Sequence, residues 1–244
     1  MKRQSGFWGA IAVGAAALAM VFAGPESMGG GAAPAPMKTP IVYRDPFVGA
    51  PLMRVDGCTR GVDDALLTLT VLAPEHVGLT IQEQPTLYWY QSRAANTRFE
   101  LTILEGDREN ALLEVRMESV PTDGIQKFRL SEHGIKLKVG IEYRWTVAMV
   151  IDAENRSRDV VASGVIKRVA APETLAPRLA KNPQDAAFIY ADEGIWYDSL
   201  TSLSDLIDQQ PRAQKLHELR GIYFLQAGLK NAAEFEMRLA AAKR

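Results

Sequence analysis

Few residues of this 244-residue chain have the type and spacing that a chemical site requires. The three histidines, His76, His133 and His217, lie in different segments, and none has a second histidine or a cysteine at the spacing of zinc ligands. We therefore interpret all three as solvated turn or helix residues. The sequence predicts neither a metal site nor a cofactor.

The remaining reactive side chains could serve in catalysis or metal binding, but each also has a structural interpretation. Cys58 has no general base next to it in the sequence and is interpreted as a partly buried, inert thiol or an intermolecular contact. The pairs Asp63-Asp64 and Asp192-Glu193 resemble those of glycosidases or calcium sites, but adjacent carboxylates on a solvated turn or helix end are far commoner. We expect a protein that is not an enzyme.

The overall charge argues against nucleic acid as a partner. The chain has 28 lysines and arginines against 29 acidic residues, a formal net charge of −1. Nucleic-acid binding relies on an excess of clustered basic side chains that neutralise phosphates. With 47% hydrophobic and 23% charged residues, the composition is that of a globular protein.

The N-terminus predicts export. Residues 1–23 read as a signal peptide, because Lys2 and Arg3 precede the uncharged stretch 7–22, with a cut expected between Ala23 and Gly24. The stretch is shorter than the roughly 20 residues of a membrane span, and no cysteine follows it for lipid attachment. We expect a periplasmic or secreted protein that is not a lipoprotein and has no stable membrane span after cleavage.

Residues 24–53 are rich in Gly, Pro and Ala and predict a flexible linker, within which the apolar residues from Ile41 to Tyr43 could dock on the body of the protein. Residues 54–171 predict a β-sandwich domain, since apolar residues alternate with polar ones at the period of two that half-buried strands show. The expected strands lie near 67–71, 86–91, 98–103, 113–118, 125–130, 143–149 and 160–169, with Gly164 at a bulge. Seven short strands of this spacing are typical of an immunoglobulin-like antiparallel sandwich, with Trp89, Trp145 and Trp196 as core anchors.

Residues 172–244 predict a helical repeat region packed on the sandwich. At an offset of 34 residues, small, aromatic and glycine positions match: Ala187 with Gly221, Tyr190 with Phe224, Gly194 with Gly228, Ser199 with Ala233, and Leu206 with Ala240. Tetratricopeptide repeats have this period, and a generic helical hairpin is the alternative. The predicted fold class is therefore α+β, mainly β: an immunoglobulin-like sandwich followed by tetratricopeptide-like α-hairpins.

Several motifs between residues 54 and 210 resemble the bacterial family catalogued as domain of unknown function 928. The most distinctive is Glu193-Gly194-Ile195-Trp196-Tyr197-Asp198-Ser199-Leu200, and others are Pro85-Thr86-Leu87-Tyr88-Trp89-Tyr90 and Val139-Gly140-Ile141-Glu142-Tyr143-Arg144-Trp145. The resemblance implies an exported protein of this architecture and no assigned activity.

Two candidate interaction surfaces follow. Likeness to tetratricopeptide repeats places six residues on an inner groove of the kind that binds extended peptides: Lys181, Gln184, Phe188, Lys215, Glu218 and Ile222. Tyr88 and Tyr90 alternate with Leu87 and Trp89 and could form an aromatic platform for a sugar or peptide, unless helices cover that face of the sheet.

The leading hypothesis is an envelope or periplasmic interaction module with an unidentified protein or peptide partner. The first alternative is a module that binds cell-envelope polysaccharide through the two tyrosines. The second is an unrecognised hydrolase, because catalytic residues can be dispersed in sequence.

Overall fold

The computed structural model describes residues 40–58, 67–106, 110–118 and 122–242. All of them belong to one compact unit. The predicted signal peptide, the predicted linker up to residue 39 and the pair Asp63-Asp64 lie outside the described residues.

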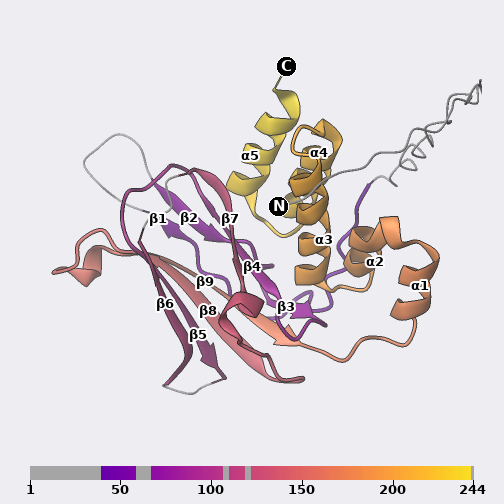
Figure 1. The fold of residues 1–244 in the computed structure, drawn as a ribbon, viewed down its shortest axis with the longest axis horizontal. Coiled ribbons are helices and arrows are strands. Elements are labelled where there is room, and N and C mark those ends of the chain that lie inside the picture. Colours follow the sequence, from indigo (N-terminus) through magenta and orange to yellow (C-terminus); the bar gives the residue numbers. More distant parts are fainter. Residues whose placement is uncertain (1–39, 59–66, 107–109, 119–121, 243–244) are drawn as a thin grey trace, which may run out of the picture. The chain divides into compact units, whose positions relative to one another are not determined.

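In the described part of the chain, nine strands form two sheets that face each other (Figure 1). One sheet has the order β1-β2-β4-β7 and the other the order β3-β9-β8-β5-β6. The strands are β1 (Gly57–Cys58), β2 (Thr68–Val71), β3 (Val77–Thr80), β4 (Thr86–Gln91), β5 (Phe99–Glu105), β6 (Ala111–Met117), β7 (Gly124–Arg129), β8 (Glu142–Met149) and β9 (Val160–Arg168).

The alternation of side chains explains why these segments form strands. In β5, Phe99, Leu101 and Ile103 are buried while the residues between them are half-exposed, and β8 buries every second residue in the same way. Residues with period two place one row of side chains against the opposite sheet. All seven predicted strands are present.

Two short strands were not predicted, and one of them changes the topology. The strand β3 pairs with β9 in parallel, so the five-stranded sheet is mixed rather than antiparallel throughout. The predicted bulge at Gly164 is wrong, because Gly164 lies in continuous register opposite Trp145. A Cβ atom at this glycine would lie 2.9 Å from the Cβ of Ala73, which explains why a residue without a side chain occupies the position.

The C-terminal part consists of helices that pair as hairpins, α2 with α3 and α4 with α5. Their bounds are α1 (Leu175–Lys181), α2 (Ala186–Asp192), α3 (Trp196–Gln209), α4 (Gln214–Gln226) and α5 (Lys230–Ala241); three short 3-10 helices are η1 (Leu130–His133), η2 (Arg156–Arg158) and η3 (Pro183–Asp185). Both hairpin turns contain a glycine with positive φ, Gly194 (71°) and Gly228 (69°), at the positions that the offset of 34 residues equates. Such a conformation favours glycine at a helix end.

The first turn of α3 joins the helices to both sheets. The Trp196 indole N–H donates to the carbonyl of Leu72 (2.9 Å), and the Tyr197 hydroxyl accepts from the Trp145 indole N–H (2.9 Å). Asp198 accepts a hydrogen bond from the Thr80 hydroxyl (2.6 Å). The most distinctive of the family-like motifs is therefore the segment that docks the helices.

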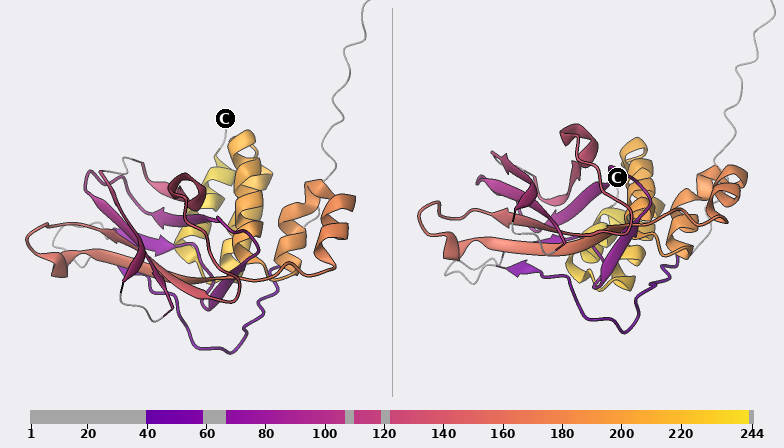
Figure 2. Two further views of the ribbon diagram at one scale, coloured as in Figure 1. Left: turned by 60° about the horizontal axis from the view of Figure 1, so that its bottom comes forward. Right: turned by 90° about the horizontal axis from the view of Figure 1, so that it is seen from below.

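A single hydrophobic cluster runs from the interior of the sandwich into the helical hairpins, and Trp89, Trp145 and Trp196 are all buried in it. The helix α3 packs against β3 and β4, while α5 packs against β7. Figure 2 shows the helices gathered beside the sheets rather than between the strands. The strand-rich α+β class of the prediction, two sheets followed by helices, is confirmed. The immunoglobulin and tetratricopeptide likenesses stay predictions.

Candidate functional site

The six residues of the predicted groove, which we call the helical face, lie at the surface of the helices. Lys181, Gln184 and Lys215 are exposed, and Phe188, Glu218 and Ile222 are half-buried. Residues four apart lie on one side of a helix, so the next positions along this face are Asp192 on α2 and Gln226 on α4. Both positions contact another part of the chain.

That part is the segment 41–44, which we call the arm. The Gln226 side chain binds the arm backbone twice: its amide nitrogen donates to the Ile41 carbonyl (2.9 Å), and its oxygen accepts from the Tyr43 N–H (2.8 Å). The Arg44 N–H donates to the Ala191 carbonyl at the end of α2 (3.1 Å). Figure 1 shows this indigo segment running beside the helices. The Ala191 carbonyl also accepts from the Gly194 N–H (3.1 Å), so the arm adds a second donor at this helix end.

The side chains of the arm alternate between the protein and solvent. Ile41 and Tyr43 are buried, whereas Val42 and Arg44 are exposed, as expected of an extended chain. The Tyr43 ring meets the Trp196 ring edge-on at a centroid distance of 5.0 Å, and the Trp196 ring stacks on that of Tyr223 at 4.3 Å. We call the residues that receive the arm the arm site: Ala191, Asp192, Trp196, Tyr223 and Gln226.

One polar group in this arrangement has no partner. The Tyr43 hydroxyl is buried and forms no hydrogen bond with any described residue. Burial raises the pKa of this phenol well above its usual range, followed in size by the effects of Asp45 and Tyr197. A buried polar group without a partner destabilises the state that buries it.

Ion pairs occupy the carboxylate pair Asp192-Glu193. The Arg178 guanidinium binds Asp192 (2.7 Å) and also Glu193, and Arg44 of the arm binds the other oxygen of Asp192 (2.8 Å). Hydrogen bonding to Asp192 is the largest cause that raises the pKa of Arg178. The ion pairs therefore join α1 and the arm to the end of α2.

The proposed tyrosine platform is wrong as an exposed surface. Tyr88 is 2% exposed and Tyr90 is 3% exposed, because the helices cover this face of β4. The Tyr90 ring packs on Phe235 of α5, and burial raises the pKa of the Tyr88 hydroxyl, an effect that a hydrogen bond to Thr201 of α3 opposes. The alternative, in which both faces of this strand are covered, is the correct one.

Two of the three histidines are not solvated, contrary to the expectation. His76 and His217 are buried, while His133 is exposed and stacks on Phe128. The two ring nitrogens of His217 lie 2.8 Å from a Glu236 oxygen and 3.1 Å from the Pro211 carbonyl oxygen. Both ring nitrogens of His217 thus face oxygen atoms of the protein.

His217 is part of a buried charged cluster between α4 and α5. The Arg220 guanidinium donates to the other oxygen of Glu236 (2.7 Å) and to the Ser204 hydroxyl (3.1 Å). Glu236 is completely buried, and its two oxygens lie against the His217 ring and the Arg220 guanidinium. The cluster fixes the pairing of the two helices.

Cys58 is an exposed free thiol rather than a partly buried one. Within the described residues, no group of three or more histidine, cysteine or acidic side chains could hold a metal ion.

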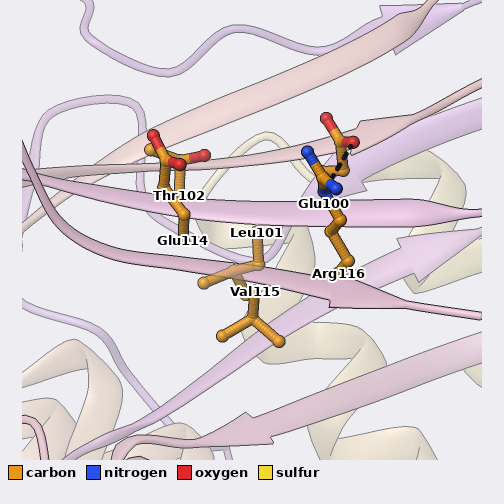
Figure 3. A pocket seen from close by; sticks show the side chains of 6 residues that line it. All are labelled: Glu100, Leu101, Thr102, Glu114, Val115 and Arg116. Carbon is orange, nitrogen blue, oxygen red and sulfur yellow. Dashed lines mark ion pairs between the residues drawn. The ribbon is translucent and has the colours of Figure 1, made fainter.

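A shallow pocket of about 120 Å³ lies on the face of β5 and β6. Figure 3 shows Glu100, Thr102, Glu114 and Arg116 on one side of the sheet and Leu101 and Val115 on the other. A hydrogen bond from Arg156 (2.7 Å) lowers the pKa of Glu100, which keeps this carboxylate ionised. A general acid requires the opposite shift.

Sequence reasoning placed the helical face but missed the arm site one helical turn further on. The signal that could have found Asp192 and Gln226 is their spacing of four residues from Phe188 and Ile222. Their partner could not be found in this way, because Gln226 and Tyr43 are 183 residues apart in the chain.

These features define an α+β protein in which two sheets support helical hairpins that hold an extended segment of the same chain. It belongs to the family described as Domain of Unknown Function (DUF928), whose model matches residues 55–237. The match confirms the suspected resemblance. The arm site lies inside the matched range, and the arm lies before it. The comparison with curated proteins gives no match. Among the described residues, no helix is both long and apolar enough to cross a membrane.

Proposed function

We propose that this protein is an exported, non-enzymatic interaction module of the periplasm or envelope, whose helical face binds an extended segment of another protein. The observation that carries the proposal is the arm: the ends of α2 and α4 bind an extended backbone through Gln226 and the Ala191 carbonyl. Hydrogen bonds to the backbone give affinity for an extended chain whatever its sequence, and pockets for alternate side chains give selectivity.

The composition of the helical face supports the same proposal. Phe188 and Ile222 are half-buried apolar side chains that pack on the core and still present surface to solvent. Lys181 at the end of α1 and Lys215 in the first turn of α4 are exposed. Apolar anchors within a polar, charged rim are the usual anatomy of a protein interface.

The acidic groups support a non-enzymatic role. Asp192 and Glu193 are paired with arginines, and Glu100 is held ionised by its arginine neighbours. The positively charged start and the uncharged stretch of residues 1–23 support export. Because Tyr88 and Tyr90 are buried, no observation favours the polysaccharide alternative.

In-cell photocrosslinking of the exported protein tests the proposal. A photoreactive amino acid is placed at Lys181 or Lys215, with a probe at Lys136 on the sandwich as the control. We expect one reproducible protein partner at the first two positions that is lost with Phe188→Ala and retained with Leu239→Ala, an equally apolar change on α5. Equal labelling from Lys136, or a partner that is indifferent to Phe188→Ala, would contradict the proposal.

A further inference from the structure

The arm occupies its site as a ligand occupies a binding site. The hydrogen bonds, ion pair and ring contacts between the arm and this site use the arm backbone or the side chains of Tyr43 and Arg44. The Ile41 side chain is buried in the hydrophobic cluster that contains Trp196 and Tyr223. Val42 points to solvent and is 51% exposed. The site therefore favours an apolar residue at the first of four consecutive positions, any residue at the second, an aromatic residue at the third and a basic residue at the fourth.

Each of these preferences has a physical cause. Ile41 is fully buried and so must be apolar. The third position packs edge-on against the stacked rings of Trp196 and Tyr223, which lie 5.0 and 5.9 Å from the ring of Tyr43. The fourth position faces the Asp192 carboxylate, which pairs with Arg44 at 2.8 Å. Charge complementarity at this position selects against acidic residues.

The arm is not the best ligand for this site. The Tyr43 hydroxyl is buried without a partner among the described residues, so a ring without the hydroxyl would avoid burying an unpaired polar group. The arm also lies before the range that the family model matches, whereas every residue of the arm site lies within that range. The match therefore includes the site but not the segment that occupies it.

We infer that the arm site is a binding site for an extended peptide of the pattern apolar, any residue, phenylalanine, basic, presented by a partner protein, and that the arm occludes it in the absence of that partner. This inference rests on the proposed function and names the chemistry of the partner. Because the arm competes from the same chain, the apparent Kd of the partner equals the intrinsic Kd divided by the fraction of time that the site is free.

The test uses the full chain with Ile41→Ala and Tyr43→Ala, which removes both buried side chains of the arm. A fluorescein-labelled peptide with the sequence of residues 40–46 is titrated against this variant and against the wild-type chain, and binding is followed by fluorescence anisotropy. We expect binding to the variant and at least about tenfold weaker binding to the wild type, since the arm competes. The peptide with phenylalanine in place of Tyr43 binds about tenfold more tightly than the tyrosine peptide.

A matched pair of glutamine variants locates the peptide. Gln226→Ala, added to the vacated chain, weakens binding by at least about tenfold because it removes both backbone hydrogen bonds. Gln209→Ala, an exposed glutamine at the far end of α3, leaves binding unchanged. If the double variant does not fold by circular dichroism, Ile41→Ala alone is used in the same titration.

Three results would overturn the inference. They are equal affinity of wild-type and vacated chains, tighter binding of the tyrosine peptide than of the phenylalanine peptide, and wild-type dimers formed by arm exchange without binding of added peptide. Absence of peptide binding would not affect the crosslinking experiment at Lys181 and Lys215, so the two proposals can be rejected independently.

Discussion

The indole nitrogen of Trp145 lies 2.9 Å from the phenol oxygen of Tyr197, and this hydrogen bond joins the second sheet to the first turn of α3. The same hydroxyl donates to the Val165 carbonyl (3.3 Å), so it is paired on both sides. Both side chains are completely buried. The contact explains why a helix is docked by a tyrosine rather than by a phenylalanine of the same shape.

Tyr197→Phe keeps the ring and removes the hydroxyl. The Trp145 N–H and the Val165 carbonyl then lose a partner in a buried place, and the free energy of unfolding falls by about 1 to 3 kcal/mol. Urea denaturation followed by tryptophan fluorescence measures the loss. Tyr190→Phe, on a half-buried ring of α2, is the control and changes stability by less than about 0.5 kcal/mol. Equal effects of the two variants would mean that the hydrogen bond contributes nothing.

The buried Asp198 makes stability depend on pH. Burial, which hydrogen bonds from Thr80 and the Ile81 N–H only partly offset, raises the pKa of Asp198 from 3.8 to about 6. The folded state then holds more protons than the unfolded state between these values. The contribution of Asp198 to the free energy of unfolding is therefore largest at low pH and decreases as the pH rises to about 6.

Asp198→Asn removes this dependence while retaining an oxygen acceptor for Thr80. Compared with the wild type, the variant becomes relatively more stable as the pH rises, by about 2 kcal/mol between about pH 4 and pH 7. Urea denaturation of both proteins across this range measures the difference, in which all other titrating groups cancel. If the free energies of unfolding of the two proteins change in parallel with pH, the pKa of Asp198 is not raised by folding.

The Glu236 cluster and a surface ion pair give a contrasting prediction. Glu236→Ala leaves Arg220 buried without its counter-ion and removes the partner of the His217 ring, and the loss of stability is about 3 to 5 kcal/mol. Glu218→Ala removes the exposed pair with Lys215 (2.9 Å) and lowers stability by less than about 1 kcal/mol. Thermal unfolding monitored by circular dichroism compares the two. Similar losses of stability in the two variants would show that the buried cluster contributes no more to stability than the surface ion pair.

Alanine substitutions at two glycines with similar φ angles distinguish displacement of the arm from backbone strain alone. At Gly194 (φ 71°) a Cβ atom would lie 2.7 Å from the Arg44 carbonyl oxygen, whereas at Gly140 (φ 85°) it would meet nothing within 4 Å. Both changes to alanine strain the backbone by about 1 to 2 kcal/mol, but only Gly194→Ala displaces the arm. We expect faster tryptic cleavage after Arg44 in Gly194→Ala than in Gly140→Ala, and equal rates would be evidence against the contact.

Most strands could be predicted because their burial follows from local alternation. Leu101 and Ile103 face the core, as the alternation of apolar and polar residues in the sequence predicts, and the same holds for β8. The strand β3 escaped prediction because its form depends on distant neighbours: a Cβ on Gly78 would lie 2.5 Å from the Tyr197 ring. No residue near position 78 in the sequence indicates that the Tyr197 ring packs there.

The candidate site divides in the same way. The helical face was predicted from the likeness to repeats of 34 residues, and its role in binding stays a prediction. Tyr88 and Leu87 differ in no local feature that tells which one faces solvent, and the packing of α3 and α5 on β4 buries both. The apolar character of Ile41 and Tyr43 predicted that they would dock, but only the fold shows that Gln226 receives them.

Hydrogen exchange at the amides of Tyr43 and Arg44 tests the central claim, that the helix ends hold an extended chain, most directly. In the full-length wild-type chain we predict that both amides are protected, because they donate to Gln226 and to the Ala191 carbonyl. Gln226→Ala should remove this protection while leaving that of the amides of β8 and β9 unchanged, and Gln209→Ala should change neither. Amides at 43 and 44 that exchange freely in the wild-type chain, or that stay protected in Gln226→Ala, would contradict the account.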